Sequence, residues 1–439
     1  MILRFFRLHA LMAMVVTLLM ASVAVSCIED GITTSPSHQP LFSTDTLRIG
    51  DIFTGESTPT HTVKVYNPHD KILSISSIGM ASGSSGIFRI NVDGQSGTRF
   101  DNVEIRPHDS IFIFVAATLP ENGSWLPVEV KDKIEFITNG IASQIVVTAN
   151  GQDIERMHAV TVDTDLRWTA EHPRQIYDSL VVAPGATLVL EAGARLYFHD
   201  KASLIVHGTL ITEGTPEAPV ELTGDRRGNV VTDISFDLMS RQWQGVRFTP
   251  SSDGNTLRHT EIRNTWTGVT VDSAAVTPSR PILSMVNCRL RNADGHVLQA
   301  THSWIAMVGC ELAEAGAGPL AVTGGRLDMD HCTVSNYYLF SAIRGACVIL
   351  GHINEKTDDR SGRPYLSATI NNCIIYGSSA DMTPGSLDGS EVFVRRSLLR
   401  SNGTDDDHFI DIIWNQDPLF YTVRADYIFD YRLQEGSPA

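Results

Sequence analysis

Two carboxylates lie two residues apart in the segment Asp328-Met329-Asp330. Successive side chains of a strand point to opposite faces, so both carboxylates face outward if Met329 faces inward. A pair of carboxylates on one face can supply the acid and the base of glycoside hydrolysis. The equivalent positions of neighbouring repeats carry no carboxylate: they are Ser284 and Val286, Ala306 and Val308, and Thr369 and Asn371. Asp328 and Asp330 are therefore candidate catalytic residues, with a solvated surface pair as the alternative.

A second group of carboxylates is the run Asp405-Asp406-Asp407-His408. Calcium prefers carboxylate oxygens, so Asp405 and Asp407 are candidate Ca²⁺ ligands. The sequence predicts no cofactor, with Ca²⁺ as the alternative. The spacing does not match an EF-hand loop, and three adjacent aspartates cannot all face one ion. A solvated charged loop is the alternative. His259 and His331 each precede a repeated small residue, which favours a surface or structural role over metal binding.

Cysteines recur at a fixed interval in the middle of the chain. Cys288, Cys310 and Cys332 are separated by 310 − 288 = 22 and 332 − 310 = 22 residues. The same register fits Thr260 before them and Cys373 and Ser397 after them. Apolar residues around each position alternate at period 2, which indicates strands. A fixed period of this length predicts a solenoid, here a right-handed parallel β-helix of about nine or ten coils.

The repeated small residues are expected to form a structural ladder inside this β-helix, because equivalent residues of stacked coils lie about 4.8 Å apart. Free buried thiols that pack as small hydrophobic groups are the favoured interpretation. Disulfides between coils are the alternative, since an exported chain can form them. Thiol counting under denaturing conditions distinguishes the two. Thr260 and Ser397 occupy the same position, which neither a metal ligand nor an obligatory disulfide would tolerate.

The N-terminus has the features of an export signal. Arg4 and Arg7 precede an apolar run, and Ala24-Val25-Ser26-Cys27 ends it. This ending resembles a bacterial lipobox, which implies a signal peptide over 1–26 and lipid attachment at Cys27. A simple cleaved signal peptide is the alternative. The resemblance implies anchoring to the outer membrane or cell surface of a Gram-negative bacterium, and residues 27–40 are expected to form a flexible tether.

The net charge of −16 argues against nucleic acid as a partner, because such partners require a basic surface. Residues 41–153 contain short alternating strands separated by turns such as Asn67-Pro68 and Asn139-Gly140. About seven strands of this kind predict an Ig-like β-sandwich. The order of these strands resembles the sandwich domains of the abnormal-spindle/hydin type, with a spacer or docking role.

Residues 154–439 are predicted to form the β-helix, so that the fold class is all-β. The runs Pro184–Ala194, Leu204–Leu210 and Trp243–Phe248 resemble the opening coils of the pectin-lyase-like superfamily. Enzymes of that superfamily cleave polysaccharides. The chain lacks the Arg, Lys and Asp signatures of pectate lyases and the paired-Asp runs of polygalacturonases. The inserted segment 224–242 is expected to protrude and to offer a binding surface.

Two functional hypotheses follow. The first is a non-catalytic binding or adhesive scaffold on the cell surface, with polysaccharides or surface glycans as ligands. The second is a polysaccharide lyase or glycoside hydrolase that acts in a groove of the β-helix. A groove that holds carboxylates and arginine favours catalysis, and a groove of only apolar and neutral residues argues against it.

Overall fold

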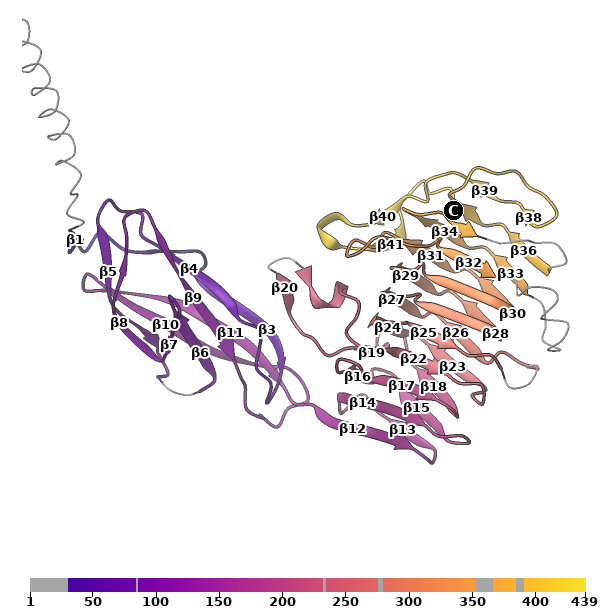
Figure 1. Ribbon diagram of the computed structural model, residues 1–439, viewed down its shortest axis with the longest axis horizontal. Helices are drawn as coiled ribbons and strands as arrows, with labels where there is room; N and C mark the ends of the chain where they lie inside the picture. The colour runs from indigo at the N-terminus through magenta and orange to yellow at the C-terminus, as the bar shows by residue number, and fades with distance from the viewer. Residues whose placement is uncertain (1–30, 84–85, 232–233, 275–278, 352–365, 384–390) are drawn as a thin grey trace, which may run out of the picture. The chain divides into compact units, whose positions relative to one another are not determined.

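A computed structural model describes residues 31–439, apart from 84–85, 232–233, 275–278, 352–365 and 384–390 (Figure 1). The predicted signal peptide and Cys27 therefore lie outside the described residues. The chain divides into two compact units: residues up to Asn122 together with Pro127–Gln152, and Gly123–Leu126 together with Asp153–Ala439. Within the described residues, no helix has the length and apolar character needed to cross a membrane.

The first unit contains two packed sheets, as the Ig-like prediction requires. One sheet has the order β1-β5-β10-β11-β3, with β8 also paired to β5, and the other has the order β2-β4-β9-β6-β7. The bounds of the strands are β1 Ile32–Thr33, β2 Leu41–Phe42, β3 Thr46–Phe53, β4 His61–Tyr66, β5 Ile72–Met80, β6 Phe88–Val92, β7 Gln95–Gly97, β8 Arg99–Ile105, β9 Ser110–Ala117, β10 Val128–Thr138 and β11 Ile141–Gln152.

Alternation of side chains builds the core of this sandwich. In β4, Val63 and Val65 are fully buried, whereas Thr62, Lys64 and Tyr66 face outward. The inward residues of both sheets form one apolar cluster. This is the arrangement in which an antiparallel sheet covers a core with one face and meets water with the other.

The described part of the segment 27–40 contacts the sandwich. Strand β1 pairs in parallel with β5, through Ile32 and Ile72. The ring of His38 stacks on His69 with a centroid distance of 4.1 Å. The Asn139 amide donates to the Ser35 carbonyl at 3.0 Å. The ordered part of this unit therefore begins before residue 41, where the sequence predicted a tether.

The second unit is the parallel β-helix that the repeat predicts. Among the residues that the structure describes, its sheet has 26 strands from β12 to β39, omitting β20 and β21, and every pairing between them is parallel. Most strands pair with the strand three positions later, as β22 does with β25 and β23 with β26, so one coil contributes three strands. Successive coils stack as steps in Figure 1.

The strands of the β-helix are short, as the period of one coil requires. Their bounds are β12 Glu155–Val162, β13 Leu166–Trp168, β14 Arg174–Val182, β15 Thr187–Glu191, β16 Arg195–Phe198, β17 Ser203–Val206, β18 Thr209–Glu213, β19 Val220–Gly224, β22 Gly245–Phe248, β23 Asn255–Arg258, β24 Thr260–Thr265, β25 Val269–Val271, β26 Leu283–Val286, β27 Arg289–Ala293, β28 Leu298–Val308, β29 Glu311–Ala315, β30 Leu320–Asp330, β31 Thr333–Asn336, β32 Val348–Gly351, β33 Ser367–Asn371, β34 Ile374–Gly377, β35 Met382–Thr383, β36 Glu391–Arg395, β37 Leu398–Leu399, β38 Phe409–Ile410 and β39 Ile413–Trp414.

Two smaller elements lie outside the stacked coils. The inserted segment forms β20 (Asn229–Val231), β21 (Ile234–Ser235) and the 3₁₀ turn η1 (Phe236–Leu238). The C-terminal segment forms the antiparallel pair β40 (Phe420–Thr422) and β41 (Asp430–Leu433), with the 3₁₀ turn η2 (Ala425–Tyr427) between them.

The small residues of the repeat form a buried column. Cys288, Cys310, Cys332, Cys373, Thr260 and Ser397 are each at most 2% exposed, and the four cysteines are free. The Cys310 N–H donates to Cys332 Sγ at 3.4 Å, and the Cys332 N–H donates to Cys373 Sγ at 3.4 Å. The Cys373 N–H continues the column to Ser397 Oγ at 3.1 Å. Each coil is therefore tied to the next through this position.

The column marks a sharp corner of each coil. The residue before each ladder position has a positive φ, and this set comprises His259, Asn287, Gly309, His331, Asn372 and Arg396. A left-handed residue bends the chain sharply within one position, at a cost for side chains other than glycine. The ladder residue after it points into the core, where only a small side chain fits beneath the turn.

Trp168 belongs to the apolar core at the first coil. Its ring is 5% exposed within the core cluster, and the Arg174 guanidinium lies 4.6 Å from its centroid. Tyr177 instead lies on an outer face, between the rings of His158 at 4.5 Å and His199 at 4.6 Å. Alternation along β14 explains the difference, because Ile176 takes the inward position next to Tyr177.

Replacing Cys310 with leucine is expected to lower the free energy of unfolding by about 1–3 kcal/mol, because the longer side chain overpacks the column. Cys310→Ser is the matched control. Its hydroxyl can donate to the Val308 carbonyl, as the Cys310 thiol does at 3.5 Å and as Ser397 does to Arg395 at 2.8 Å. Urea unfolding followed by far-UV circular dichroism measures both variants. Equal stability of Cys310→Leu and the wild type would contradict a tightly packed column.

Candidate functional site

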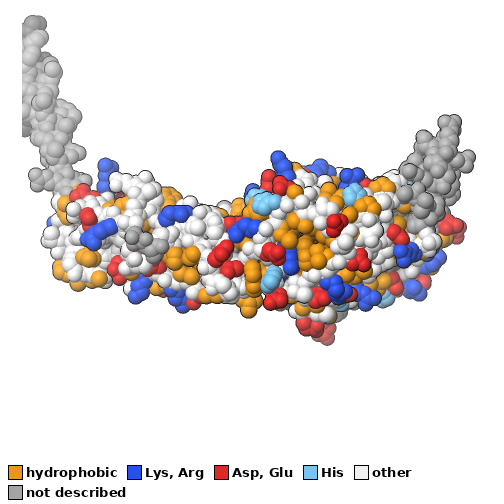
Figure 2. Space-filling view, turned by 90° about the horizontal axis from the view of Figure 1, so that it is seen from below, with side chains coloured by type: hydrophobic (Ala, Val, Ile, Leu, Met, Phe, Trp, Pro, Cys, Tyr) orange, Lys and Arg blue, Asp and Glu red, His pale blue; other side chains and the backbone are white. Residues whose placement is uncertain are grey.

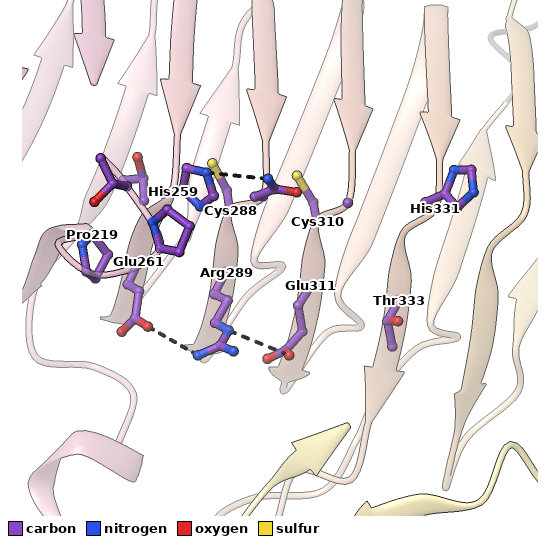
Figure 3. A pocket seen from close by; sticks show the side chains of 14 residues that line it. Pro219, His259, Glu261, Cys288, Arg289, Cys310, Glu311, His331 and Thr333 are labelled. Atoms are coloured by element: carbon purple, nitrogen blue, oxygen red, sulfur yellow. Dashed lines mark hydrogen bonds and ion pairs between the residues drawn. The ribbon is translucent and has the colours of Figure 1, made fainter. Parts of the chain in front are cut away.

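A polar groove follows the corner that the ladder defines (Figure 3). Its volume is about 360 Å³, and it crosses the successive strands β24, β27, β29 and β31. The first outward residue after each ladder position forms one row, and the left-handed corner residues form a second row. The lining side chains are Glu261, Arg289, Glu311 and Thr333 in the first row, His259, Asn287, Gly309 and His331 in the second, and Thr215, Pro216 and Pro219 at one end.

Charges in the first row alternate in sign. Arg289 stands between two carboxylates, with its Nη1 3.4 Å from Glu261 Oε1 and its Nε 3.9 Å from Glu311 Oε2. The Arg289 side chain is 53% exposed. Pairs of this length in contact with water contribute little stability. Arg289 is therefore positioned by the strand yet keeps donors available to a ligand.

Arg263 behaves differently although it belongs to the same sheet. Its side chain is 13% exposed, and it binds Glu261 at 2.9 Å and Glu221 at 3.3 Å. Asp237 of η1 adds a longer contact to Arg263 at 3.7 Å. These contacts hold the Glu261 carboxylate in place, so that one oxygen is committed to Arg263 and the other faces Arg289.

The inserted segment is fastened beside this sheet through backbone carbonyls. The Asn264 and Asn292 amides donate to the Asp237 carbonyl at 2.8 Å and 2.7 Å. The Asn264 amide also donates to the Met239 carbonyl at 2.9 Å. The sequence predicted a protruding surface here, and the structure ties its described part to successive coils.

Glu311 is the groove carboxylate with a perturbed acidity. Its pKa is raised, first by burial, which disfavours the charged form, and further by the negative charges of Glu261 and Asp430. Arg291 and Arg289 act in the opposite direction. The groove therefore combines a carboxyl group that holds its proton more strongly than usual with Glu261, which is held by Arg263.

Glu314 lies three residues beyond Glu311 and is buried beneath the C-terminal β40–β41 pair. It has a φ of 57° and is 1% exposed. The Tyr431 hydroxyl donates to its carboxyl group, while Phe420 and Tyr431 pack on Ala313. Burial raises the pKa of Glu314 to about 8. A neutral carboxyl group therefore fastens the C-terminal strands to the β-helix.

Asp328 and Asp330 share one outer face, as alternation predicts, but they lie on β30 and not in the groove. Their pairing partners include Ala306, Val308, Thr369 and Asn371. Trp304 Nε1 donates to Asp328 at 2.7 Å, and Arg326, which lies 4.2 Å from the Trp304 ring, donates to it at 2.9 Å. The Asn372 amide donates to Asp330 at 2.8 Å. Both carboxylates thus serve contacts between coils.

The aspartates at 405–407 organise their own loop. Asp405 accepts from the Asp411 N–H at 2.8 Å and from Trp414 Nε1 at 3.0 Å, and the Trp414 bond is the first cause of its lowered pKa. Asp406 accepts from the His408 and Phe409 N–H groups. Asp407 is exposed. Across the described residues, no group of three or more His, Cys, Asp or Glu side chains is placed to hold a metal ion.

Sequence reasoning missed the groove because it searched for the same residue type on adjacent coils. Glu261, Arg289, Glu311 and Thr333 occupy equivalent positions but differ in type and charge. Their common signal is that each directly follows a ladder residue. The polar residue at that single position, compared across the coils, therefore reveals the row in the sequence. His259 and His331, expected at the surface, line its edge.

Comparisons with known proteins add little to this geometry. No protein-family model matches the chain, and no curated protein matches its sequence. Among solved structures, a study of glycolipid glycan hydrolysis by a family 123 glycoside hydrolase from Clostridium perfringens describes a chain that matches with 10% identity and a TM-score of 0.19. The match covers 28% of this chain and 26% of that chain, so this chain spans about a quarter of its length. A similarity this weak supports no conclusion about function.

Glu314→Gln is expected to remove part of the pH dependence of stability. The folded pKa of about 8 lies above the ordinary value of 4.5, so the stability that Glu314 contributes is complete below about 4.5 and declines as pH rises toward 8. The slope is at most about 1.4 kcal/mol per pH unit. As the pH rises between these values, the thermal midpoint should fall less in the variant than in the wild type.

Glu435→Gln is the matched control for Glu314→Gln, because it makes the same substitution at an exposed position near the C-terminus. It should follow the wild-type pH profile. A Glu314→Gln profile parallel to the wild type would show that the Glu314 carboxyl group is already ionised near neutral pH.

Proposed function

We propose that the chain is an exported, lipid-anchored protein of the outer membrane or cell surface of a Gram-negative bacterium, and that it binds glycans without cleaving them. The observation that carries the binding role is the groove, where donors and acceptors alternate across four stacked strands. Sugar hydroxyl groups both donate and accept hydrogen bonds. A row of carboxylate, guanidinium, amide and imidazole groups matches that chemistry.

The direction of the groove supports an extended ligand. The row from Glu261 to Thr333 runs along the stacking direction of the coils, with one side chain from each coil. Equivalent side chains are separated by about 4.8 Å. An oligosaccharide lying along this direction would meet a new polar side chain at each coil, whereas a compact metabolite would use only part of the row.

The anchoring part of the proposal rests on the sequence. Ala24-Val25-Ser26-Cys27 ends an apolar run in the manner of a lipobox, and Cys27 would carry the acyl chains. A sandwich of the abnormal-spindle/hydin type would then link the anchor to a β-helix of the pectin-lyase-like superfamily. In this arrangement the membrane is one partner and surface glycans are the other.

Arg289→Ala is expected to weaken oligosaccharide binding by about tenfold to a hundredfold, since a hydrogen bond to a charged group contributes about 1.5–3 kcal/mol. Arg247→Ala is the control, because it removes an exposed guanidinium that pairs with Asp272 at 2.8 Å outside the groove. A glycan array followed by calorimetry with the strongest oligosaccharide measures both. Binding in the groove would be contradicted if both variants lost oligosaccharide affinity equally, or if neither variant lost affinity.

A polysaccharide lyase or glycoside hydrolase is the second candidate. The carboxylates and the arginine that line the groove favour it, as does the raised pKa of Glu311. Glu311 would act as the acid and Glu261, which accepts a hydrogen bond from Arg263 at 2.9 Å, as the base. They are two coils apart, roughly 9–10 Å along the backbone stack, which is near the upper separation of inverting glycosidases. Release of sugar ends by the wild type, abolished in Glu311→Gln, would establish this alternative. A Ca²⁺ requirement for that release would favour a lyase.

A further inference from the structure

A second hollow lies in the first unit, on the outer face of the β2-β4-β9-β6-β7 sheet. It has a volume of about 800 Å³ and is lined by β6, β7 and β9. This size is within the range of small-molecule sites. The side chains used below are Phe114 of β9, Arg89 and Asn91 of β6, and Ser96 of β7 with the adjacent Thr98.

Phe114 provides an exposed aromatic surface in this hollow. Phe112 and Phe114 both point outward from β9 and are 40% and 36% exposed. Their rings are nearly parallel, with an interplanar angle of 15° and a centroid distance of 6.1 Å. The Lys64 ammonium lies 5.3 Å from the Phe112 ring. Within the described residues, no cationic side chain lies over Phe114.

The other outer aromatics of the molecule are often covered by arginine. Arg326 lies 4.2 Å from the Trp304 ring, Arg395 lies 4.7 Å from Phe393, and Arg241 lies 5.1 Å from Trp266. A ligand that stacked on any of these rings would first have to displace a guanidinium. Phe114 requires no such displacement, which makes it the better stacking surface.

Polar groups surround the Phe114 ring. The pairing of β9 with β6 places Asn91 directly opposite Phe114, and Asn91 pairs in turn with Ser96. The Asn91 amide donates to Ser96 Oγ at 3.1 Å, while its Oδ1 is shielded from water and has no donor among the described residues. An unsatisfied acceptor of this kind costs about 1–3 kcal/mol. As the side chain stands, Oδ1 is closed to the hollow, so a bound hydroxyl group can supply the missing donor only after the Asn91 amide turns toward it.

Arg89 completes the rim at the end of β6 that lies away from the turn between β6 and β7. It is exposed and donates to Ser57 Oγ at 3.2 Å, which leaves further guanidinium donors available. The hydroxyl groups of Ser96 and Thr98 are exposed on the opposite strand. The hollow therefore has an apolar ring bordered by one guanidinium, one amide and two hydroxyl groups.

We propose that this hollow is a glycan-binding site of the sandwich, in which a neutral sugar ring stacks on Phe114 and its hydroxyl groups bind Asn91, Arg89 and Ser96. The apolar C–H face of a sugar carries a slight positive charge and packs on the negative face of an aromatic ring. The edge of the same ring presents hydroxyl groups to the polar rim. This site is independent of the groove in the β-helix.

A peptide is the less suitable occupant. It would add to the open edge of β7 through backbone hydrogen bonds, and it would not need the Phe114 ring or the Asn91 acceptor. Among the described residues that line the hollow there is also no carboxylate that would select a basic peptide. The arrangement of one exposed ring with an amide, two hydroxyl groups and one guanidinium fits a sugar better.

The test uses the full chain carrying Arg289→Ala, so that binding in the β-helix groove is weakened. This protein and its Phe114→Ala, Phe112→Ala and Phe114→Tyr derivatives are applied to an array of neutral and acidic oligosaccharides. The strongest neutral oligosaccharide is then titrated by calorimetry. Loss of Phe114 should weaken binding by about tenfold, whereas Phe112→Ala and Phe114→Tyr should stay within about twofold. Thermal midpoints confirm that each variant is folded.

Three outcomes would overturn the site. The Arg289→Ala protein could retain no oligosaccharide, Phe114→Ala could bind as tightly as its parent, or Phe112→Ala could lose as much affinity as Phe114→Ala. Selective binding of acidic oligosaccharides would also contradict a neutral sugar ring. A result that contradicts binding in the groove would not affect the test of the hollow, because Arg289→Ala tests the groove and Phe114→Ala tests the hollow.

Discussion

The β-helix depends on the contact between one small buried side chain and its equivalent on the next coil. At the ladder, backbone N–H groups bind the sulfur or oxygen of the following coil, as Cys310 binds Cys332 and Cys373 binds Ser397. A left-handed residue immediately before the ladder turns the chain. Together these features fix the register of the strand that follows, because a shift by one residue would move a large side chain into the column.

The groove is a consequence of that register. Once the ladder residue faces inward, the next residue must face outward, so Glu261, Arg289, Glu311 and Thr333 form a row without any direct contact being needed to align them. Packing therefore determines where the side chains lie, and their chemistry remains free to vary. The same alternation places Asp328 and Asp330 on the outer face. There, Trp304 and Arg326 donate hydrogen bonds to Asp328, and Asn372 donates one to Asp330.

The sequence predicted the β-helix because its signal is repeated many times. The 22-residue interval, the alternation and the small residue at one position all indicate the same register. The groove of the β-helix and the hollow at Phe114 have no such repeated signal in the sequence. Ile111-Phe112-Ile113-Phe114-Val115 is apolar throughout, so the alternation cannot show which residues face outward, and the structure is needed to show that both phenylalanines do. The raised pKa of Glu314 likewise comes from burial beneath residues far away in the chain, and the hydrogen bond from Tyr431 acts in the opposite direction.

The ladder also determines how such a protein can change in length. Most strands bond only to the equivalent strands of the coils on either side, so each coil is a unit that meets its neighbours through the same contacts. Duplication or loss of one whole coil would preserve the column and would lengthen or shorten the polar row by one side chain. Insertion or deletion of a single residue inside a coil would instead shift the strands that follow out of register. Variation in the length of the groove is therefore expected to occur in steps of one coil.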